Sequence, residues 1–241
     1  PIISNYDEIF QVLDLPYLFQ DYDHINAFLA SDICQQLLDS LTSTGARMLC
    51  MQAVGFRNMD MCTGPVKTPA DIAGTKIRVT DSPIYRAQYE AWGANPQIIA
   101  GPEVLTALQQ GTIDAQENPL SVITSSRFNE VQDYLSMTEH VYSAAPLMVS
   151  KAAYDALPDD LKAIVDEAGV EACQWEREYL AEVEVQWLDE LETAGTQINY
   201  PDKAPFVDAM SSVYNQFVGD GDDMVSPELL EQVREIISQV E

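Results

Sequence analysis

The chain has 241 residues, of which 46% are hydrophobic, and it carries 12 basic against 39 acidic residues, a net charge of −27. This composition supports a hydrophobic core rather than wholesale disorder, and the length fits one large domain or two small ones. The shortage of Lys and Arg disfavours nucleic acids and anionic membrane surfaces as partners, and no apolar run approaches the roughly 20 residues that span a bilayer.

In the first half of the chain, predicted helices and strands alternate. A helix from about Asp23 closes near Gly45 and precedes a buried strand, ARMLCMQAVGFRNM. A short helix capped by Thr68 leads to the strand KIRV. Helices over PIYRAQYEAWG, GPEVLTALQQG and PLSVITSSRFNEV then alternate with strands over NPQIIA, TIDAQ, YLSMTEHVY and APLMVSK. This rhythm predicts an α/β architecture with mostly parallel strand pairing.

The alternation of short helices and strands stops at Pro158. Residues 158–195 form one helical pattern of roughly 35 residues, about 50 Å long if it is continuous. Such a helix either bridges two lobes or kinks, and Gly169 is the expected place for a kink. A strand over TQINYP and two helices, APFVDAMSSVYNQFVG and SPELLEQVREIISQV, complete the chain.

The cysteines at positions 34, 50, 62 and 173 show no CxxC spacing, so we interpret them as core residues rather than as disulfides or a zinc site. The extreme acidity leaves two interpretations open. One is a saline habitat, in which salt screens the self-repulsion, and the other is a merely acidic protein.

Catalytic motifs are missing from the sequence. It contains no GxSxG, P-loop, GxGxxG or HExxH pattern, and its two histidines, His24 and His140, lie in unrelated segments. In so acidic a chain, neighbouring carboxylates indicate a charged surface, and the acidic run at 219–224 does not have EF-hand spacing. We therefore expect neither enzymatic activity nor a metal or cofactor.

The few basic residues indicate more about function than the many acidic residues do. Arg78 lies within the strand KIRV, where a guanidinium group needs a partner. It either pairs with an internal carboxylate or clamps a ligand carboxylate through two hydrogen bonds. Arg57, in VGFRNMD, is a second candidate, with a surface or hinge role as its alternative. Asn118 precedes Pro119, a pattern typical of a helix N-cap.

Several segments taken together resemble one family. LPYLFQDYDH, PVKTPADIAGTKIRV, WGANPQII, EVLTALQQGTIDAQENP and MTEHVY are similar, in order, to the DctP-like substrate-binding proteins of tripartite ATP-independent periplasmic (TRAP) transporters. The resemblance covers essentially the whole chain. It implies a monomeric periplasmic receptor with two α/β lobes, a long domain-spanning helix and a hinged cleft. Such a receptor binds an organic acid and delivers it to membrane permease subunits.

The same resemblance implies site residues. Arg78 corresponds to the family's ligand-carboxylate arginine, Asn118 to an asparagine facing the cleft, and Arg57 to a second, less uniform arginine. His140 falls where some sugar-acid binders have a site-adjacent histidine. Asp81 departs from the asparagine of sialic-acid binders, and it could pair with Arg78 or accept hydrogen bonds from a ligand.

The resemblance also implies the division of the chain. We expect one lobe over residues 1–55 and 144–183 and the other over 56–143 and 184–241. Family members normally begin with a further βα segment, so we expect the first lobe to lack its N-terminal part here.

Two other classes of function stay open at this point. The first is a sensory module that uses the same cleft to report a ligand. The second is an α/β enzyme acting on an organic acid, for which Asp81, Glu103 and His140 are the candidate general bases. We count these three as candidate ligand contacts as well.

Overall fold

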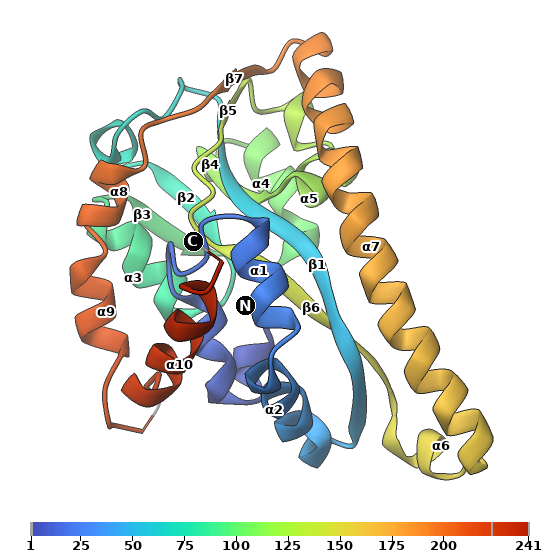
Figure 1. Cartoon of the computed structure of the whole chain (residues 1–241). Coiled ribbons are helices and arrows are strands. Elements are labelled where there is room, and N and C mark those ends of the chain that lie inside the picture. The colour runs from blue at the N-terminus through green and yellow to red at the C-terminus, as the bar shows by residue number, and fades with distance from the viewer. Residues whose placement is uncertain (1, 223, 241) are drawn as a thin grey trace.

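Figure 1 shows the computed structural model, which describes residues 2–222 and 224–240. Within these residues, one mixed sheet of seven strands has the order β3-β2-β4-β1-β5-β7, and β6 pairs with β1. The strands are β1 (Ala46–Met61), β2 (Lys76–Val79), β3 (Asn95–Ile98), β4 (Ala115–Pro119), β5 (Tyr134–Ser136), β6 (Tyr142–Ser150) and β7 (Gln197–Asn199).

Ten α-helices surround the sheet in the described part of the chain. They are α1 (Tyr22–Leu29), α2 (Asp32–Ser40), α3 (Pro83–Ala91), α4 (Val104–Gln109), α5 (Leu120–Ser125), α6 (Lys151–Asp155), α7 (Asp159–Thr193), α8 (Ala204–Asp208), α9 (Ser211–Phe217) and α10 (Pro227–Ile237). Short 3₁₀ helices lie at Ile2–Asn5, Glu8–Asp14, Leu41–Thr44, Pro69–Ile72, Gly101–Glu103 and Phe128–Glu130. The segment APFVDAMSSVYNQFVG, predicted as a single helix, therefore forms two, α8 and α9.

The sheet is not mostly parallel, as the sequence had predicted. Only the pairs β2–β3, β2–β4 and β5–β7 are parallel, whereas β1 runs antiparallel to β4, β5 and β6. The reason is the length of β1, whose 16 residues pair with β6 along the first part and with β4 and β5 on opposite edges of the last part. The alternation of helices and strands indicates the α/β class, but it does not reveal the direction of such non-local pairs.

β1 changes partners near its middle. Its first part pairs with β6 as far as Phe56, and its last part, from Arg57, pairs with β4 on one edge and, from Met59, also with β5 on the other. A register shift between Ala53 and Gly55 precedes the change. Gly55 has φ +114°, a backbone conformation that calls for glycine, and a Cβ there would lie 2.8 Å from Oε1 of Glu184 on α7, whose side chain would have to move.

α7 runs alongside β1 as one uninterrupted helix of 35 residues (Figure 1). The kink considered at Gly169 does not occur. Instead, Gly169 lets the helix approach the strand closely, because a Cβ at this position would lie only 2.7 Å from Cβ of Leu49. One turn further along, Cys173 forms a disulfide with Cys50 of β1.

This disulfide corrects the interpretation of all four cysteines as core thiols. Cys50 and Cys173 are 123 residues apart in sequence, so only the three-dimensional packing of α7 on β1 reveals the pair. Cys34 is a buried free thiol and Cys62 an exposed one.

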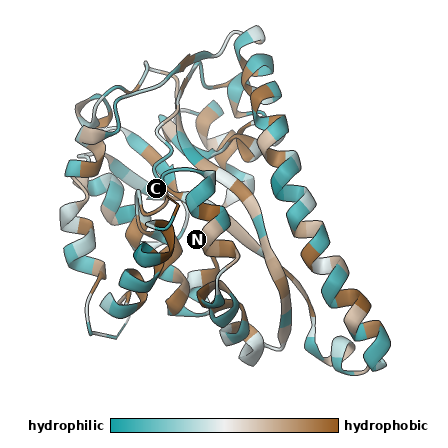
Figure 2. Ribbon diagram, viewed as in Figure 1, coloured by the Kyte–Doolittle hydropathy of each residue, from teal (hydrophilic) through white to brown (hydrophobic). Residues whose placement is uncertain are grey.

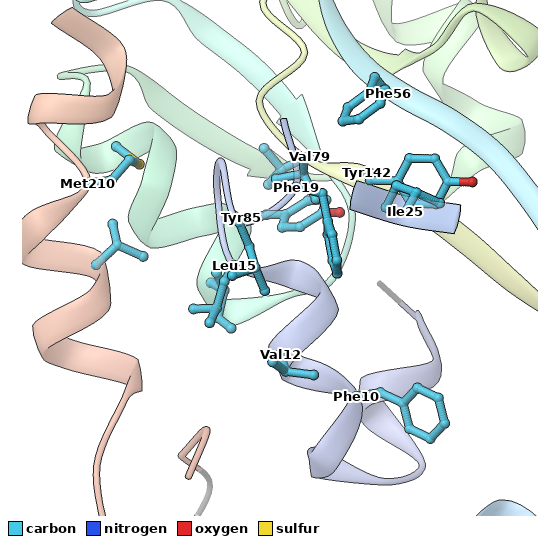
Figure 3. Packing of buried hydrophobic residues seen from close by; sticks show 14 of the residues in the cluster. Phe10, Val12, Leu15, Phe19, Ile25, Phe56, Val79, Tyr85, Tyr142 and Met210 are labelled. Carbon is cyan, nitrogen blue, oxygen red and sulfur yellow. The ribbon is translucent and has the colours of Figure 1, made fainter. Parts of the chain in front are cut away.

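The larger hydrophobic cluster joins distant parts of the chain. Figure 3 shows Leu15, from the N-terminal region, in one cluster with Tyr85 of α3 and with Met210. Phe56 and Tyr142 pack edge-on in the same cluster, with ring centroids 5.2 Å apart, where β1 changes partners. In Figure 2, polar and apolar residues are interspersed along α7. Among the described residues, no helix combines the length and hydropathy required to cross a membrane.

Candidate ligand-binding site

Side chains from three strands converge on one pocket. Arg57 of β1, Arg78 of β2 and Asn118 of β4 line a hollow of about 230 Å³. The other described residues of its wall are uncharged, and they are Ile2, Thr80, Gly101, Val104, Val122, Ser126 and Phe128. The structure thus brings together three of the residues that the sequence nominated.

Every nitrogen of the Arg57 guanidinium group donates a hydrogen bond within the protein. Nη2 donates to Oε1 of Glu117 at 2.8 Å and to Oδ1 of Asn118 at 3.0 Å, and Nη1 donates to Oγ of Ser143 at 3.0 Å. Nε donates to the other carboxylate oxygen of Glu117. The internal ion pair that was one alternative for Arg78 therefore belongs to Arg57.

Glu117 is completely buried, and its charge is held by its partners. Burial by itself raises the pKa of this carboxyl group, but the charge of Arg57 and hydrogen bonds from Arg57 and His140 outweigh burial and lower the pKa to about 2. Conversely, burial lowers the pKa of Arg57, and the carboxylate of Glu117 raises it above its ordinary value. The pair is therefore ionised and electrically neutral as a unit.

His140 contacts the carboxylate of Glu117 and so supports this ion pair. Nε2 lies 3.3 Å from Oε2 of Glu117 and 3.1 Å from the hydroxyl of Tyr89, and Nδ1 lies 2.8 Å from Oγ1 of Thr138. Burial lowers the pKa of His140, although Glu117 opposes the shift. Because a carboxylate can only accept, a neutral His140 carries its proton on Nε2 and donates it to Glu117. His140 is 1% exposed and does not line the pocket.

The guanidinium group of Arg78 has fewer partners than that of Arg57 among the described residues. Among the described residues it makes no ion pair, and its one side-chain hydrogen bond runs from Nε to the carbonyl oxygen of Ile99 at 2.9 Å. Burial, and secondarily the charge of Arg57, lower the pKa of Arg78, while Glu117 opposes this. A guanidinium group nevertheless stays protonated. The terminal nitrogens of Arg78 thus offer donors for a further partner at the pocket.

Asn118 is not a helix cap, which corrects the sequence interpretation. β4 extends to Pro119, which itself occupies the N-cap position of α5, because β4 keeps its pairing with β1 through this point. The side chain of Asn118 instead accepts from Arg57 and donates from Nδ2 to Oε1 of Gln116 at 2.5 Å. Gln116 in turn donates to Oδ2 of Asp60 at 2.7 Å.

Sequence reasoning missed Glu117, Gln116 and Asp60. Their signal was the run of consecutive polar residues QEN inside a strand, together with the polar positions of RNMD in β1. Asp81 and Glu103 are exposed and are not among the residues that line the pocket. Within the described residues, no group of His, Cys, Asp and Glu side chains is arranged to hold a metal ion.

Comparison with known proteins places the chain and its fold in a class. A solute-binding protein from Verminephrobacter eiseniae is 38% identical over 234 residues, which are 96% of this chain and 68% of the relative. The 2,3-diketo-L-gulonate-binding periplasmic protein YiaO of Escherichia coli is 36% identical, over 88% of this chain and 65% of the relative. The chain thus spans about two thirds of the length of these relatives.

A solved structure also indicates similarity to the solute-binding proteins. The TRAP periplasmic solute-binding protein of Polaromonas sp. JS666, bound to D-erythronate, superposes with a TM-score of 0.90 at 32% identity, covering 96% of this chain and 76% of that one. The molecule has the fold of a solute-binding protein. Residues 1–220 match the bacterial extracellular solute-binding protein family 7 (DctP), and the chain belongs to this family.

Proposed function

We propose that this protein is a periplasmic receptor that binds a small organic acid through its carboxylate and delivers it to a TRAP-type membrane permease. The observation that carries the proposal is the contrast between two arginines. Arg57 is neutralised by Glu117, whereas Arg78 brings to the same pocket terminal donors that have no partner in the described part of the chain. A guanidinium group with two free donors matches the geometry of a carboxylate.

The relatives support an acid as the ligand. YiaO is named for binding 2,3-diketo-L-gulonate, and the Polaromonas protein holds D-erythronate, and both compounds are organic acids. In our proposal Arg78 binds the carboxylate, Asn118 contributes its amide, and Arg57 borders the ligand without pairing with it. Asp81, Glu103 and His140 would act only indirectly, because none of them lines the pocket in the structure.

We further propose two lobes, residues 1–55 with 144–183 and residues 56–143 with 184–241, that close on the ligand. The change of partner along β1 at Phe56 and Arg57 supports the first boundary. Glu184 packs on Gly55 and accepts from the hydroxyl of Tyr22 at 2.6 Å, which supports a hinge where α7 passes β1.

The proposed role is binding without catalysis. Among the described residues, the carboxylate nearest to the pocket cations is Glu117, whose low pKa and full set of partners make it a poor general base. The disulfide between Cys50 and Cys173 suits an oxidising compartment such as the periplasm. The net charge of −27 fits a monomer that repels its own copies and does not bind nucleic acid.

Calorimetric titration with succinate, D-erythronate and β-D-galacturonate tests the proposal. At least one of these acids should bind, and Arg78→Ala should weaken that binding by about 2–5 kcal/mol, the usual effect of removing one partner of a buried charged contact. Arg86→Ala is the matched control, because the partner of Arg86 among the described residues is exposed Glu90 on α3. Wild-type affinity in Arg78→Ala would refute the clamp, and no binding of any panel acid would argue against the proposed ligand class.

A further inference from the structure

The buried carboxyl group of Asp60 ends a continuous line of side chains that starts at the pocket. Asp60 is 2% exposed and Gln116 is fully buried. The two residues are directly opposite each other in the pairing of β1 with β4, and Gln116 is also opposite Arg78 in the pairing of β4 with β2. Asp60, Gln116 and Arg78 therefore lie on one rung of the sheet, with their side chains on the same face.

The hydrogen bonds along this line all point one way. Arg57 can only donate, so the oxygen of Asn118 must face it, at 3.0 Å. That orientation turns Nδ2 of Asn118 toward Oε1 of Gln116, which leaves Nε2 of Gln116 to donate to Asp60 at 2.7 Å. The two ends of the line therefore determine how both amides are oriented.

We propose that Asp60 is a positioning residue of the ligand site, which acts through Gln116 to hold the amide of Asn118 in one orientation. The inference rests on the proposed function only in making Asn118 a ligand contact. Without an acceptor at position 60, Nε2 of Gln116 would be a buried donor with no partner, and a flip of its amide would present the wrong atom to Asn118.

Asp60 also makes the line sensitive to protons. Oδ1 of Asp60 is buried and has no hydrogen-bond partner among the described residues, so an added proton has a place on the carboxyl group. Burial raises the pKa of Asp60 to about 7, and the hydrogen bond from Gln116 opposes this rise. An ionised Asp60 accepts more strongly from Gln116 than a protonated one does.

The surroundings of Asp60 are mostly uncharged. α4 (VLTALQ) and α5 (LSVITS) contain no charged residue, and β5 places Leu135 opposite Asp60. Trp187, Leu188 and Leu191 of α7 pack in the same hydrophobic cluster as Leu135. On β4, Glu117 projects to the other face of the sheet, and on β2, Arg78 is one strand beyond Gln116. Gln116 is thus the direct partner through which Asp60 reaches the site.

Side-chain amide NMR of the ligand-free protein tests the coupling directly. The Asn118 amide signals, identified by their loss in Asn118→Asp, should move as pH passes through neutrality in the wild type. They should stay fixed in Asp60→Asn, which keeps an acceptor but does not titrate, and in Gln116→Leu, which breaks the line. Gln97→Leu is the control, because the side chain of Gln97 bonds to Asn95 on β3 and to no other residue that the structure describes. Signals that do not move in the wild type, or that move equally in Asp60→Asn, would overturn the proposal.

A second measurement connects the line to binding. Asp60→Leu should weaken binding of the tightest acid among succinate, D-erythronate and β-D-galacturonate at least roughly tenfold, the effect of one lost hydrogen bond of ordinary strength. Asp60→Asn, which keeps an acceptor, should bind the same acid to within about twofold of the wild type. A purely structural role would instead give Asp60→Asn and Asp60→Leu equal affinity when the two variants are equally stable. Equal affinity in Asp60→Leu and wild type would overturn the positioning role. If no panel acid binds, the proposed function fails, while the NMR result still decides the coupling.

Discussion

Oε1 of Glu117 lies 2.8 Å from Nη2 of Arg57, and the two side chains are only 0% and 6% exposed. A charge pair so far from water persists only while both partners are present, because either one alone would be an uncompensated buried charge. We therefore expect Glu117→Gln to lower the free energy of unfolding by about 3–5 kcal/mol. Urea unfolding at neutral pH measures this, and an unchanged midpoint would contradict it.

The difference between wild type and Glu117→Gln should also depend on pH. The folded-state pKa of Glu117 is about 2, below the ordinary value of 4.5, so its contribution to stability is present above pH 4.5 and is lost as pH falls toward 2. The two proteins should therefore converge in stability in acid. Glu90→Gln, at the exposed partner of Arg86, is the control and should behave like wild type throughout.

Asp60 should show the opposite dependence. Its folded-state pKa of about 7 is above the ordinary value of 3.8, so its contribution to stability is full below pH 3.8 and disappears as pH rises through 7. We expect Asp60→Asn to gain stability relative to wild type between acid and mildly alkaline pH. Thermal melting across this range measures the gain, and a constant difference between the two proteins would show that Asp60 does not titrate there.

Neutralisation of Arg57 by Glu117 leaves Arg78 as the cation without a charged partner among the described residues that line the pocket. An acid with one carboxylate matches this charge, whereas the second carboxylate of a dianion would lose water without gaining a partner. D-erythronate should therefore bind at least roughly tenfold more tightly than succinate, which has the same number of carbons. Calorimetry decides this, and Glu117→Gln should narrow the gap because it frees Arg57. Tighter binding of succinate by the wild type would refute the charge argument.

Reduction of the disulfide between Cys50 and Cys173 should destabilise the fold. Removal of a native disulfide typically costs about 2–5 kcal/mol, and this one joins residues 123 apart. The melting temperature of the wild type should fall when a thiol reductant is added, and that of a Cys50→Ser, Cys173→Ser double variant should already be low and should not respond. Cys62→Ser, at an exposed free thiol, controls for unspecific effects.

Much of the architecture could be predicted from the sequence. The strand KIRV, the strand around NPQI and the long helix after Pro158 occur as expected, because each has a strong local pattern. The direction of the pairs made by β1 was not predictable, since it depends on contacts between distant segments. The disulfide between Cys50 and Cys173 was not predictable for the same reason.

The candidate site was predictable in its cations but not in their partners. Arg78 stands out because a charged residue interrupts an apolar strand, and the structure leaves its terminal nitrogens unpaired among the described residues. Glu117 did not stand out, because one more carboxylate in a chain with 39 acidic residues carries little information. Only the pairing of β4 with β1 shows that this carboxylate is buried against Arg57.

The disulfide between β1 and α7 has a consequence for the integrity of the pocket. Arg57, Arg78 and Asn118 all lie in the stretch of chain between its two cysteines. A protease that cuts the backbone once within this stretch produces two polypeptides that stay tethered through sulfur. The nicked protein would migrate as a single species in a non-reducing gel and separate into fragments only when the tether is reduced.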